Sequence, residues 1–150
     1  MVMRFTCVGL YMTAIVITSS LMSIGSEQID TTIQEINKIP PNRRINEIPS
    51  EPFRLITAEI DDDILSVDVE YRGSQKMHEF VLYWNGIVTR SYPGQTQLYL
   101  KHNTNGDAGD SLITKTLRFR LTALHIPMII TLRGDSDQSK RIEYGVVKRR

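Results

Sequence analysis

Cysteine is nearly absent from this chain of 150 residues, and the only one, Cys7, lies close to the N-terminus. It falls within residues 1–25, which we expect to be removed, so the mature chain would contain no thiol. Without thiols a protein forms no disulfide, offers no thiolate ligand to a metal and has no cysteine nucleophile. The stability of the folded chain therefore has to come from an apolar core.

The N-terminus has the parts of a secretory signal peptide. Arg4 supplies a positive charge, and residues 5–22 form an uncharged, mostly apolar run. Residues 23–25, Ser-Ile-Gly, place small side chains at positions −3 and −1 of a cut before Ser26. We therefore expect residues 1–25 to be a cleaved signal peptide and the protein to be secreted or periplasmic in a bacterium. In the alternative reading the run remains as a membrane anchor, because about 20 apolar residues span a bilayer.

A basic excess is absent as well. Lys and Arg number 18 against 17 Asp and Glu, and removal of Arg4 with the leader makes the two counts equal. The basic run 148–150 is terminal and short, which is typical of a solvated chain end. Proteins that bind nucleic acid need a basic face to neutralise phosphates, so the composition argues against a nucleic-acid partner.

Catalytic motifs are also missing. The sequence contains no Gly-x-Ser-x-Gly elbow, no Ser-x-x-Lys, no His-Glu-x-x-His and no glycine-rich phosphate loop. Paired carboxylates are too common in any chain to identify a hydrolase by themselves. We therefore expect a protein that is not an enzyme and has no cofactor, with calcium as the one ion that a loop of this chain suggests.

Residues 77–102 show the pattern that organises the chain. Apolar side chains occupy every second position, and two turn sequences interrupt the alternation. Asn85-Gly86 favours a tight type I′ hairpin, which predicts a strand over residues 87–91. Residues 92–95, Tyr-Pro-Gly-Gln, fit a type II turn into a further strand. This stretch is therefore predicted to be a β-meander.

The same alternation continues through residues 53–150. In residues 64–71, for example, Leu65 and Val67 share one face while Ser66 and Asp68 share the other. Seven or eight such strands follow one another with no helical segment between them. This pattern predicts an all-β fold, an antiparallel immunoglobulin-like sandwich, for this part of the chain.

Residues 26–52 differ in composition and are predicted to be a linker. Ile29, Ile33 and Ile36 have the spacing of one face of a short helix. Four prolines between residues 40 and 52 would keep the following chain extended. We therefore expect a proline-rich tether, with one short helix, between the leader and the sandwich.

Two groups of residues are candidates for a binding surface. Tyr83 and Tyr99 lie on the strand faces opposite the apolar core positions, so they would form an exposed aromatic patch on one sheet. Ordinary packing on the sheet is the competing interpretation. Tyr92 and Gln95 belong to the second predicted turn and would contact a partner as a protruding wedge.

Two other groups are candidates for metal binding. The loop 103–110 carries side-chain oxygens suited to Ca²⁺, although it lacks the EF-hand pattern and also fits an ordinary long hairpin loop. His78 and His102 would share a metal if their strand ends meet, or would be half-buried rings at the rim of the sandwich. The candidate calcium ligands in the loop are Asn103, Asn105, Asp107 and Asp110.

The strand residues also occur in a recognisable order. It runs His78-Glu79-Phe80-x-Leu82-x-Trp84-x-Gly86, Ser91-x-Pro93-x-Gln95-x-x-Leu98-x-Leu100-x-His102, Asp107 and Leu117-x-Phe119-x-Leu121. Over residues 60–147 this order resembles a group of small secreted or lipid-anchored bacterial β-sandwich proteins, similar to the C-terminal domain of NigD-like proteins. The resemblance implies a cysteine in the turn before His78 and another after Asp107, where this chain has Gln75 or a neighbour and Gly109. It implies no catalytic residue.

These observations lead to one expected function and two alternatives. We expect an exported, non-enzymatic β-sandwich protein that binds a protein or a ligand of the cell envelope and does not span the membrane once the leader is cleaved. One alternative is a periplasmic enzyme inhibitor or immunity protein that uses residues 92–95 or 103–110 as a wedge. The other is a calcium- or carbohydrate-binding module.

Overall fold

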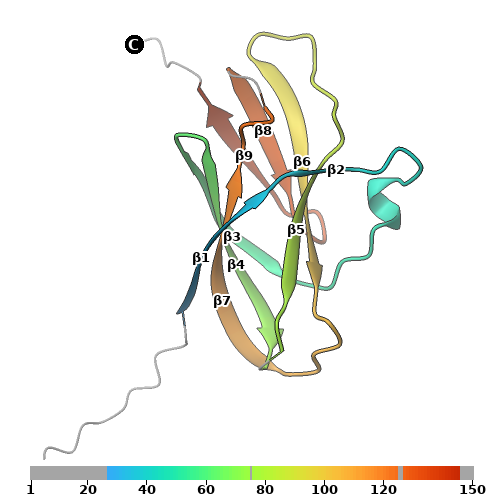
Figure 1. Ribbon diagram of the computed structural model, residues 1–150, viewed down its shortest axis with the longest axis vertical. Helices are drawn as coiled ribbons and strands as arrows, with labels where there is room; N and C mark the ends of the chain where they lie inside the picture. The colour runs from blue at the N-terminus through green and yellow to red at the C-terminus, as the bar shows by residue number, and fades with distance from the viewer. Residues whose placement is uncertain (1–26, 75, 125–126, 146–150) are drawn as a thin grey trace, which may run out of the picture.

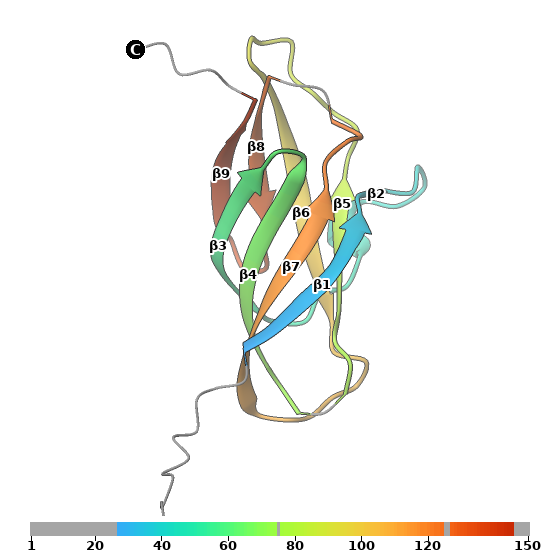
Figure 2. The same ribbon diagram turned by 60° about the vertical axis from the view of Figure 1, so that its left-hand side comes forward.

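The computed structural model describes residues 27–74, 76–124 and 127–145, so the predicted leader lies outside the described residues. Two β-sheets pack face to face, and Figure 2 shows the four-stranded sheet in front of the five-stranded one. Within the described ranges, no helix is both long enough and apolar enough to cross a membrane. The predicted all-β sandwich is confirmed.

In the part of the chain that the structure describes, the two sheets contain nine strands (Figure 1). The first sheet has the order β1 (Glu27–Glu35), β7 (Ser111–Arg120), β4 (Ile64–Gly73) and β3 (Arg54–Asp61). The second has the order β2 (Asn37–Lys38), β5 (Glu79–Trp84), β6 (Gly94–Asn103), β8 (Met128–Arg133) and β9 (Ser139–Tyr144). A short 3-10 helix, η1 (Ile45–Glu47), lies in the segment between β2 and β3.

The pairing is mixed rather than wholly antiparallel. β1 runs parallel to β7, β2 parallel to β5, and β6 parallel to β8. The remaining pairs are antiparallel. Parallel neighbours need a crossover rather than a hairpin, and here the chain changes sheet between the two strands of each parallel pair.

The core lies between the sheets and follows the alternation seen in the sequence. In β4, for instance, Leu65, Val67 and Val69 are completely buried, whereas Ser66 and Asp68 are half-buried on the outer face. Each buried Leu or Val contributes roughly 1.5–3 kcal/mol relative to an exposed one. The large side chains with almost no exposure are Phe80, Phe119, Leu65, Leu82, Leu98, Leu100, Leu117, Leu121, Ile130 and Leu132.

The predicted helix around Ile29, Ile33 and Ile36 is wrong, because residues 27–35 form strand β1. β1 adds to the sheet beside β7, whose opposite edge is paired with β4. Isoleucine and threonine are β-branched and favour strands, and the open edge of β7 supplies hydrogen-bond partners that an isolated helix would lack. The helical spacing of the three isoleucines therefore did not decide the structure.

The predicted strand at residues 87–91 is also wrong. β5 pairs directly with β6, with Trp84 opposite Leu98, and residues 85–93 form a loop between them. Gly86 has a φ of 73°, but Asn85 is not among the positive-φ residues, so the turn is not type I′. Instead Oδ1 of Asn85 accepts a hydrogen bond of 3.0 Å from the N–H of Ile87. Gly94 also lacks the positive φ that a type II turn requires, and the Tyr92–Pro93 peptide bond is cis.

Candidate functional site

Loop 85–93 is the most exposed apolar feature among the described residues. It joins β5 to β6 and extends beyond one end of the sandwich (Figure 1). Tyr92 is 89% exposed, Ile87 is 64% exposed and Val88 is 40% exposed. Large apolar side chains gathered on one exposed segment are typical of a protein interface. The loop carries a single charged side chain, Arg90.

The base of this loop is fixed by a buried threonine. Thr96, at the start of β6, is only 4% exposed. Its hydroxyl accepts a hydrogen bond of 2.8 Å from Nε1 of Trp84 and donates one of 2.7 Å to the carbonyl of Ile87. One hydroxyl therefore connects the loop backbone to the last residue of β5.

The tip of the loop is fixed by two further hydroxyls. Thr89 and Gln95 exchange two hydrogen bonds, from the Thr89 N–H to the Gln95 carbonyl (2.9 Å) and from the Gln95 N–H to Oγ1 of Thr89 (3.0 Å). Ser91 lies 2.8 Å from the Thr89 hydroxyl and donates to the carbonyl of Pro93 at 2.9 Å. The polar groups of the loop thus bond to one another, and this arrangement leaves the apolar side chains facing solvent.

The opposite end of the sandwich contains a buried polar cluster. Nδ1 of His78 lies 2.8 Å from Nε2 of His102, and Nε2 of His78 lies 3.1 Å from a carboxylate oxygen of Asp107. Nδ1 of His102 lies 3.3 Å from the carbonyl oxygen of Glu51. The side chains of His78 and Asp107 are 1% and 3% exposed. We call Asp107, His78, His102 and the Glu51 carbonyl the histidine chain.

Asp107 accepts hydrogen bonds from three other groups besides His78. The backbone N–H and the hydroxyl of Ser74 donate at 2.5 and 2.6 Å, and the N–H of Gly109 donates at 3.0 Å. The Ser74 hydroxyl and N–H hold the pKa of the Asp107 carboxyl well below its usual range. This carboxylate therefore stays charged although its side chain is enclosed.

Aromatic rings surround the two histidines. His102 stacks on Phe80 with ring centroids 4.4 Å apart, and His78 lies 4.5 Å from the ring of Tyr71. Burial lowers the pKa of His102. Burial, together with the charge of Asp107, raises the pKa of the Tyr71 hydroxyl. The strand ends of the two histidines do meet, and the rings are buried rather than half-buried as predicted.

The two histidines bond to each other and leave no position for a shared metal between them. Two nitrogens on one zinc would each lie at about 2.0–2.1 Å from the ion, which separates them by more than 3 Å. Here the facing nitrogens of His78 and His102 are 2.8 Å apart, a hydrogen-bond distance. Among the described side chains, no group of three or more His, Cys, Asp or Glu residues is arranged to hold a metal ion.

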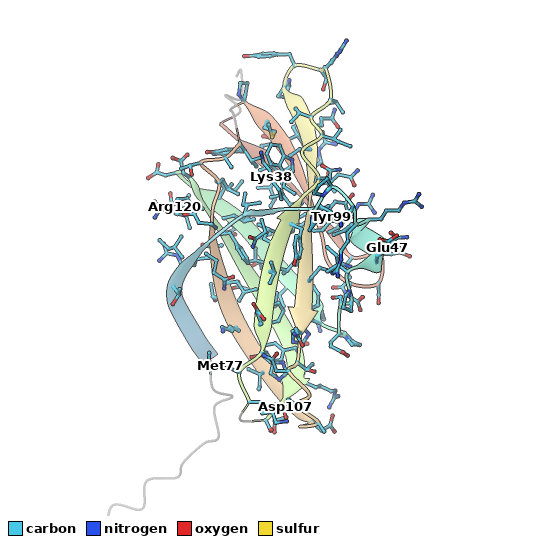
Figure 3. The ribbon with its side chains drawn as sticks, turned by 45° about the vertical axis from the view of Figure 1, so that its right-hand side comes forward. Lys38, Glu47, Met77, Tyr99, Asp107 and Arg120 are labelled. Carbon is cyan, nitrogen blue, oxygen red and sulfur yellow. The ribbon has the colours of Figure 1, made fainter. Side chains whose placement is uncertain are left out.

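The four candidate calcium ligands bond to protein groups instead. Oδ1 of Asn103 accepts from the N–H of Asn105, whose side-chain amide donates to the carbonyl of Met77. Figure 3 shows Met77 and Asp107 at this end of the molecule. Asp107 belongs to the histidine chain, and Asp110 forms an ion pair of 2.7 Å with Arg72. These contacts favour an ordinary loop over a calcium loop. The loop joins β6 to β7 in the other sheet, so it is not the hairpin loop that was predicted.

Tyr83 and Tyr99 face each other across β5 and β6, as predicted, but both are half-buried. The Tyr99 hydroxyl donates to Gln97 at 2.7 Å. Tyr83 lines a cavity of about 350 Å³ between the outer face of β5 and β6 and the segment 43–51. Tyr83 therefore lies at a groove, and Tyr99 is half-buried on the same sheet face. Tyr92 does lie in the protruding loop, whereas Gln95 is an exposed residue at the start of β6.

The cysteine positions implied by the family resemblance are adjacent in space. A Cβ atom added to Gly109 would lie 2.3 Å from Cβ of Ser74, the neighbour of Gln75. Ser74 and Gly109 both donate to Asp107. In this chain a carboxylate thus connects the two segments that a disulfide would join in the pattern the resemblance implies.

Comparison with known proteins identifies the fold. No protein-family model and no curated protein matches the chain. Three solved structures are similar to it: a protein provisionally described as toxin-related from Parabacteroides distasonis (TM-score 0.55, 16% identity), a protein of unknown function, DUF1344, from Bacteroides vulgatus (0.55, 18%) and a NigD-like immunity protein from Bacteroides caccae (0.50, 15%).

The three matches cover 75%, 77% and 77% of this chain. They cover 61%, 57% and 60% of the other chains, so this chain spans about three fifths of the length of each. At such low identity the likeness concerns the fold alone. At that level it confirms the resemblance to NigD-like proteins that the order of strand residues predicted.

Proposed function

We propose that this protein is an exported, non-enzymatic binding protein that contacts a protein partner through loop 85–93. The observation that carries the proposal is the combination of exposed apolar side chains with a backbone held by its own hydroxyls. Ordering a loop on binding costs free energy, so a loop that is already ordered binds more tightly. The Trp84–Thr96–Ile87 hydrogen bonds at the base supply this order.

An inhibitor or immunity protein is the form of binding protein that these features favour. Tyrosine and arginine contribute strongly to protein interfaces, and the loop presents Tyr92 and Arg90 beside Ile87 and Val88. Such a wedge suits an apolar cleft in a partner. The descriptions of two structural neighbours as toxin-related and as an immunity protein agree with this class of function.

The absence of catalytic motifs from the sequence supports a function without catalysis. Among the described residues, the histidine chain is the arrangement that most resembles a catalytic one, because it joins an aspartate to two histidines and Ser74 donates to that aspartate. The Ser74 hydroxyl, however, donates to Asp107 rather than to a histidine, so no base is positioned to activate it. The rings are also closed off from substrate, since His102 is only 1% exposed.

Export of the protein rests on the predicted leader. Intact mass and subcellular fractionation of the expressed full-length chain test it. We expect a mass that begins at Ser26 and recovery in the soluble exported fraction. An intact N-terminus in the membrane fraction would instead make residues 5–22 an anchor and place the binding loop on a membrane-bound protein.

Binding is tested by comparing two variants in the extracytoplasmic fraction of the source cell. The triple variant Ile87→Ser, Val88→Ser, Tyr92→Ser removes the exposed apolar surface but keeps Thr89 and Thr96. Leu112→Ser removes an equally exposed apolar side chain on β7 as a control, since Leu112 is 59% exposed. We expect the wild type and the control to recover the same protein, and an enzyme activity of that protein to fall on mixing. Equal recovery by the triple variant would contradict the proposal.

The groove beside Tyr83 favours a second candidate, a small-ligand or carbohydrate module. It combines an aromatic side chain with polar and charged groups, including Arg43 and Lys101. A small number of polar groups that converge beside an aromatic ring is typical of small-ligand sites. A sugar that raises the melting temperature of the wild type but not of Tyr83→Ala would support this candidate.

A further inference from the structure

The histidine chain ends at the wall of the groove. Ser50 and Glu51 line the groove together with His102. The N–H of Glu51 donates to the His102 carbonyl at 2.9 Å, and the N–H of His102 donates to Oγ of Ser50 at 3.2 Å. The ring of His102 adds a third contact, at 3.3 Å from the Glu51 carbonyl. Residues 50–51 are therefore attached to β6 at one residue, His102.

The protons available to this chain can be counted. The chain has three contacts, and both ends are acceptors, the Asp107 carboxylate and the Glu51 carbonyl. Two neutral imidazoles carry one N–H each, so they satisfy two of the three contacts. The third contact is satisfied only when one of the rings takes up an additional proton.

Geometry indicates which contact lacks the proton in the neutral pair. The separations are 3.1 Å from Asp107 to His78, 2.8 Å from His78 to His102 and 3.3 Å from His102 to Glu51. Two lone pairs facing each other repel, and they do so most at the shortest distance. The neutral pair therefore has Nε2–H on both rings, and the Nδ1 atom of His102 faces the Glu51 carbonyl without a proton.

We propose that the histidine chain is a proton-operated latch for the groove. Uptake of one proton from solvent at Nδ1 of His102 forms an N–H bond there, which donates to the Glu51 carbonyl and fixes residues 50–51 against β6. The Asp107 carboxylate stabilises the resulting imidazolium through the intervening ring of His78. Loss of the proton leaves two acceptors facing each other and loosens this wall of the groove.

The charged and titratable groups around the latch set the direction of its response. Burial has the largest effect on the pKa of His102 and lowers it; His78 also lowers this pKa, whereas Glu51 raises it. The Asp107 carboxylate contacts His78, and the Tyr71 hydroxyl from β4 stays neutral because its pKa is raised. Phe80 and Phe53 supply apolar contacts. Burial lowers the pKa of His102 from 6.5, so the latch closes on acidification below that value. Acidic surroundings are therefore expected to tighten the groove, and neutral surroundings to loosen it.

The ring states are tested first, by ¹⁵N NMR of the imidazoles in a His125→Gln background, which leaves His78 and His102 as the two histidines of the chain. At about pH 8 we expect both rings in the Nε2–H form. On acidification, Nδ1 of His102 should become protonated. A neutral His102 with its proton on Nδ1, or a ring that never titrates while the protein remains folded, would overturn the proposal.

The attachment of residues 50–51 to β6 is tested by native-state hydrogen exchange. The measured rates are corrected for the effect of pH on the intrinsic exchange rate of each amide. The protection of the Glu51 amide should rise about tenfold across the His102 titration, the size of one hydrogen bond to a charged donor. The Ile39 amide, which donates to the carbonyl of Trp84 at the end of β5, is the control, and its protection should not change across the titration. Titration of His102 without a change at Glu51 would show a buried base but no latch, and would contradict the proposal.

Discussion

The two loops that flank β6 use polar groups in opposite ways. Loop 85–93 precedes the strand at one end of the sandwich and loop 103–110 follows it at the other (Figure 1). Both contain an Asn-Gly pair and several hydroxyl or amide side chains. In the first loop these groups bond to the loop itself and to β6, and the apolar side chains remain exposed. In the second loop a carboxylate bonds to other segments and is buried by them.

Loop 85–93 therefore presents a surface to solvent, whereas loop 103–110 stabilises the fold. A loop that satisfies its own backbone can change its outward side chains at little cost to the fold. A loop that supplies the buried acceptor for several donors cannot, because each donor would lose its partner. We therefore expect substitutions at the first loop to affect binding and substitutions at the second to affect stability.

The largest contrast is expected between Asp107→Ala and Tyr92→Ala. Removing the Asp107 carboxylate leaves the donors of Ser74, Gly109 and His78 without an acceptor, so the urea midpoint should fall clearly. Tyr92 is exposed, and its removal should change the free energy of unfolding by no more than about 0.5 kcal/mol. Urea denaturation of both variants checks this, and similar midpoints would remove the contrast between the loops.

A glycine substitution in each loop gives a second comparison of their effects on stability. Gly109→Ala would place a Cβ atom 2.3 Å from Cβ of Ser74, so we expect a loss of about 1–3 kcal/mol or more from overpacking. Gly86→Ala has open space around it, and its cost comes from the positive φ alone, about 1 kcal/mol. Thermal unfolding of the pair measures the difference. A Gly109 variant as stable as the Gly86 variant would mean that the loop relaxes freely.

Thr96→Val tests the attachment of loop 85–93. The variant keeps the volume but leaves the Trp84 N–H and the Ile87 carbonyl without partners, so we expect a loss of about 1–3 kcal/mol and faster amide exchange within the loop. Thr96→Ser keeps the hydroxyl and is the control. Unchanged exchange in Thr96→Val would show that the loop is held by its tip alone.

The pH dependence of the free energy of unfolding should be a smaller effect than these losses. It should arise at the end of the sandwich that carries loop 103–110. Because the pKa of His102 is lowered from 6.5, the unfolded chain binds a proton in the window below 6.5 that the folded chain does not. The free energy of unfolding should therefore decrease as the pH falls through that window. His102→Gln should weaken this dependence below pH 6.5, and Tyr92→Ala should retain it. An equal slope in His102→Gln would assign the dependence to other groups.

The alternation of strand residues predicted the fold class well, because burial on one face of a sheet imposes a period of two. Leu65, Val67, Leu98 and Leu100 are buried as that period requires. The spacing of Ile29, Ile33 and Ile36 misled, since the open edge of β7 lies far from β1 in the sequence and only the folded chain brings the two together. The parallel pairs were missed for the same reason.

The candidate site was predicted in part. Tyr92 lies in a protruding loop, as its place in a predicted turn suggested, whereas Gln95 of the same predicted turn belongs to β6. Ile87 and Val88 were assigned to a strand, because Asn85-Gly86 favoured a tight hairpin. The positions of His78 and His102 near strand ends left a meeting of the two rings open, but they did not predict it. Their link to Asp107 had no sequence signal, since loop 103–110 also matched the oxygen-rich composition of a calcium loop.

The central claim, that loop 85–93 is the binding surface, is tested most directly by site-specific photo-crosslinking. A photoreactive phenylalanine analogue at Tyr92 is compared in the source cell with the same analogue at Leu112, an exposed apolar position on β7. We expect one discrete crosslinked protein from position 92, lost when Ile87 and Val88 are also changed to Ser, and none from position 112. Crosslinks from position 112 with none from position 92 would contradict it.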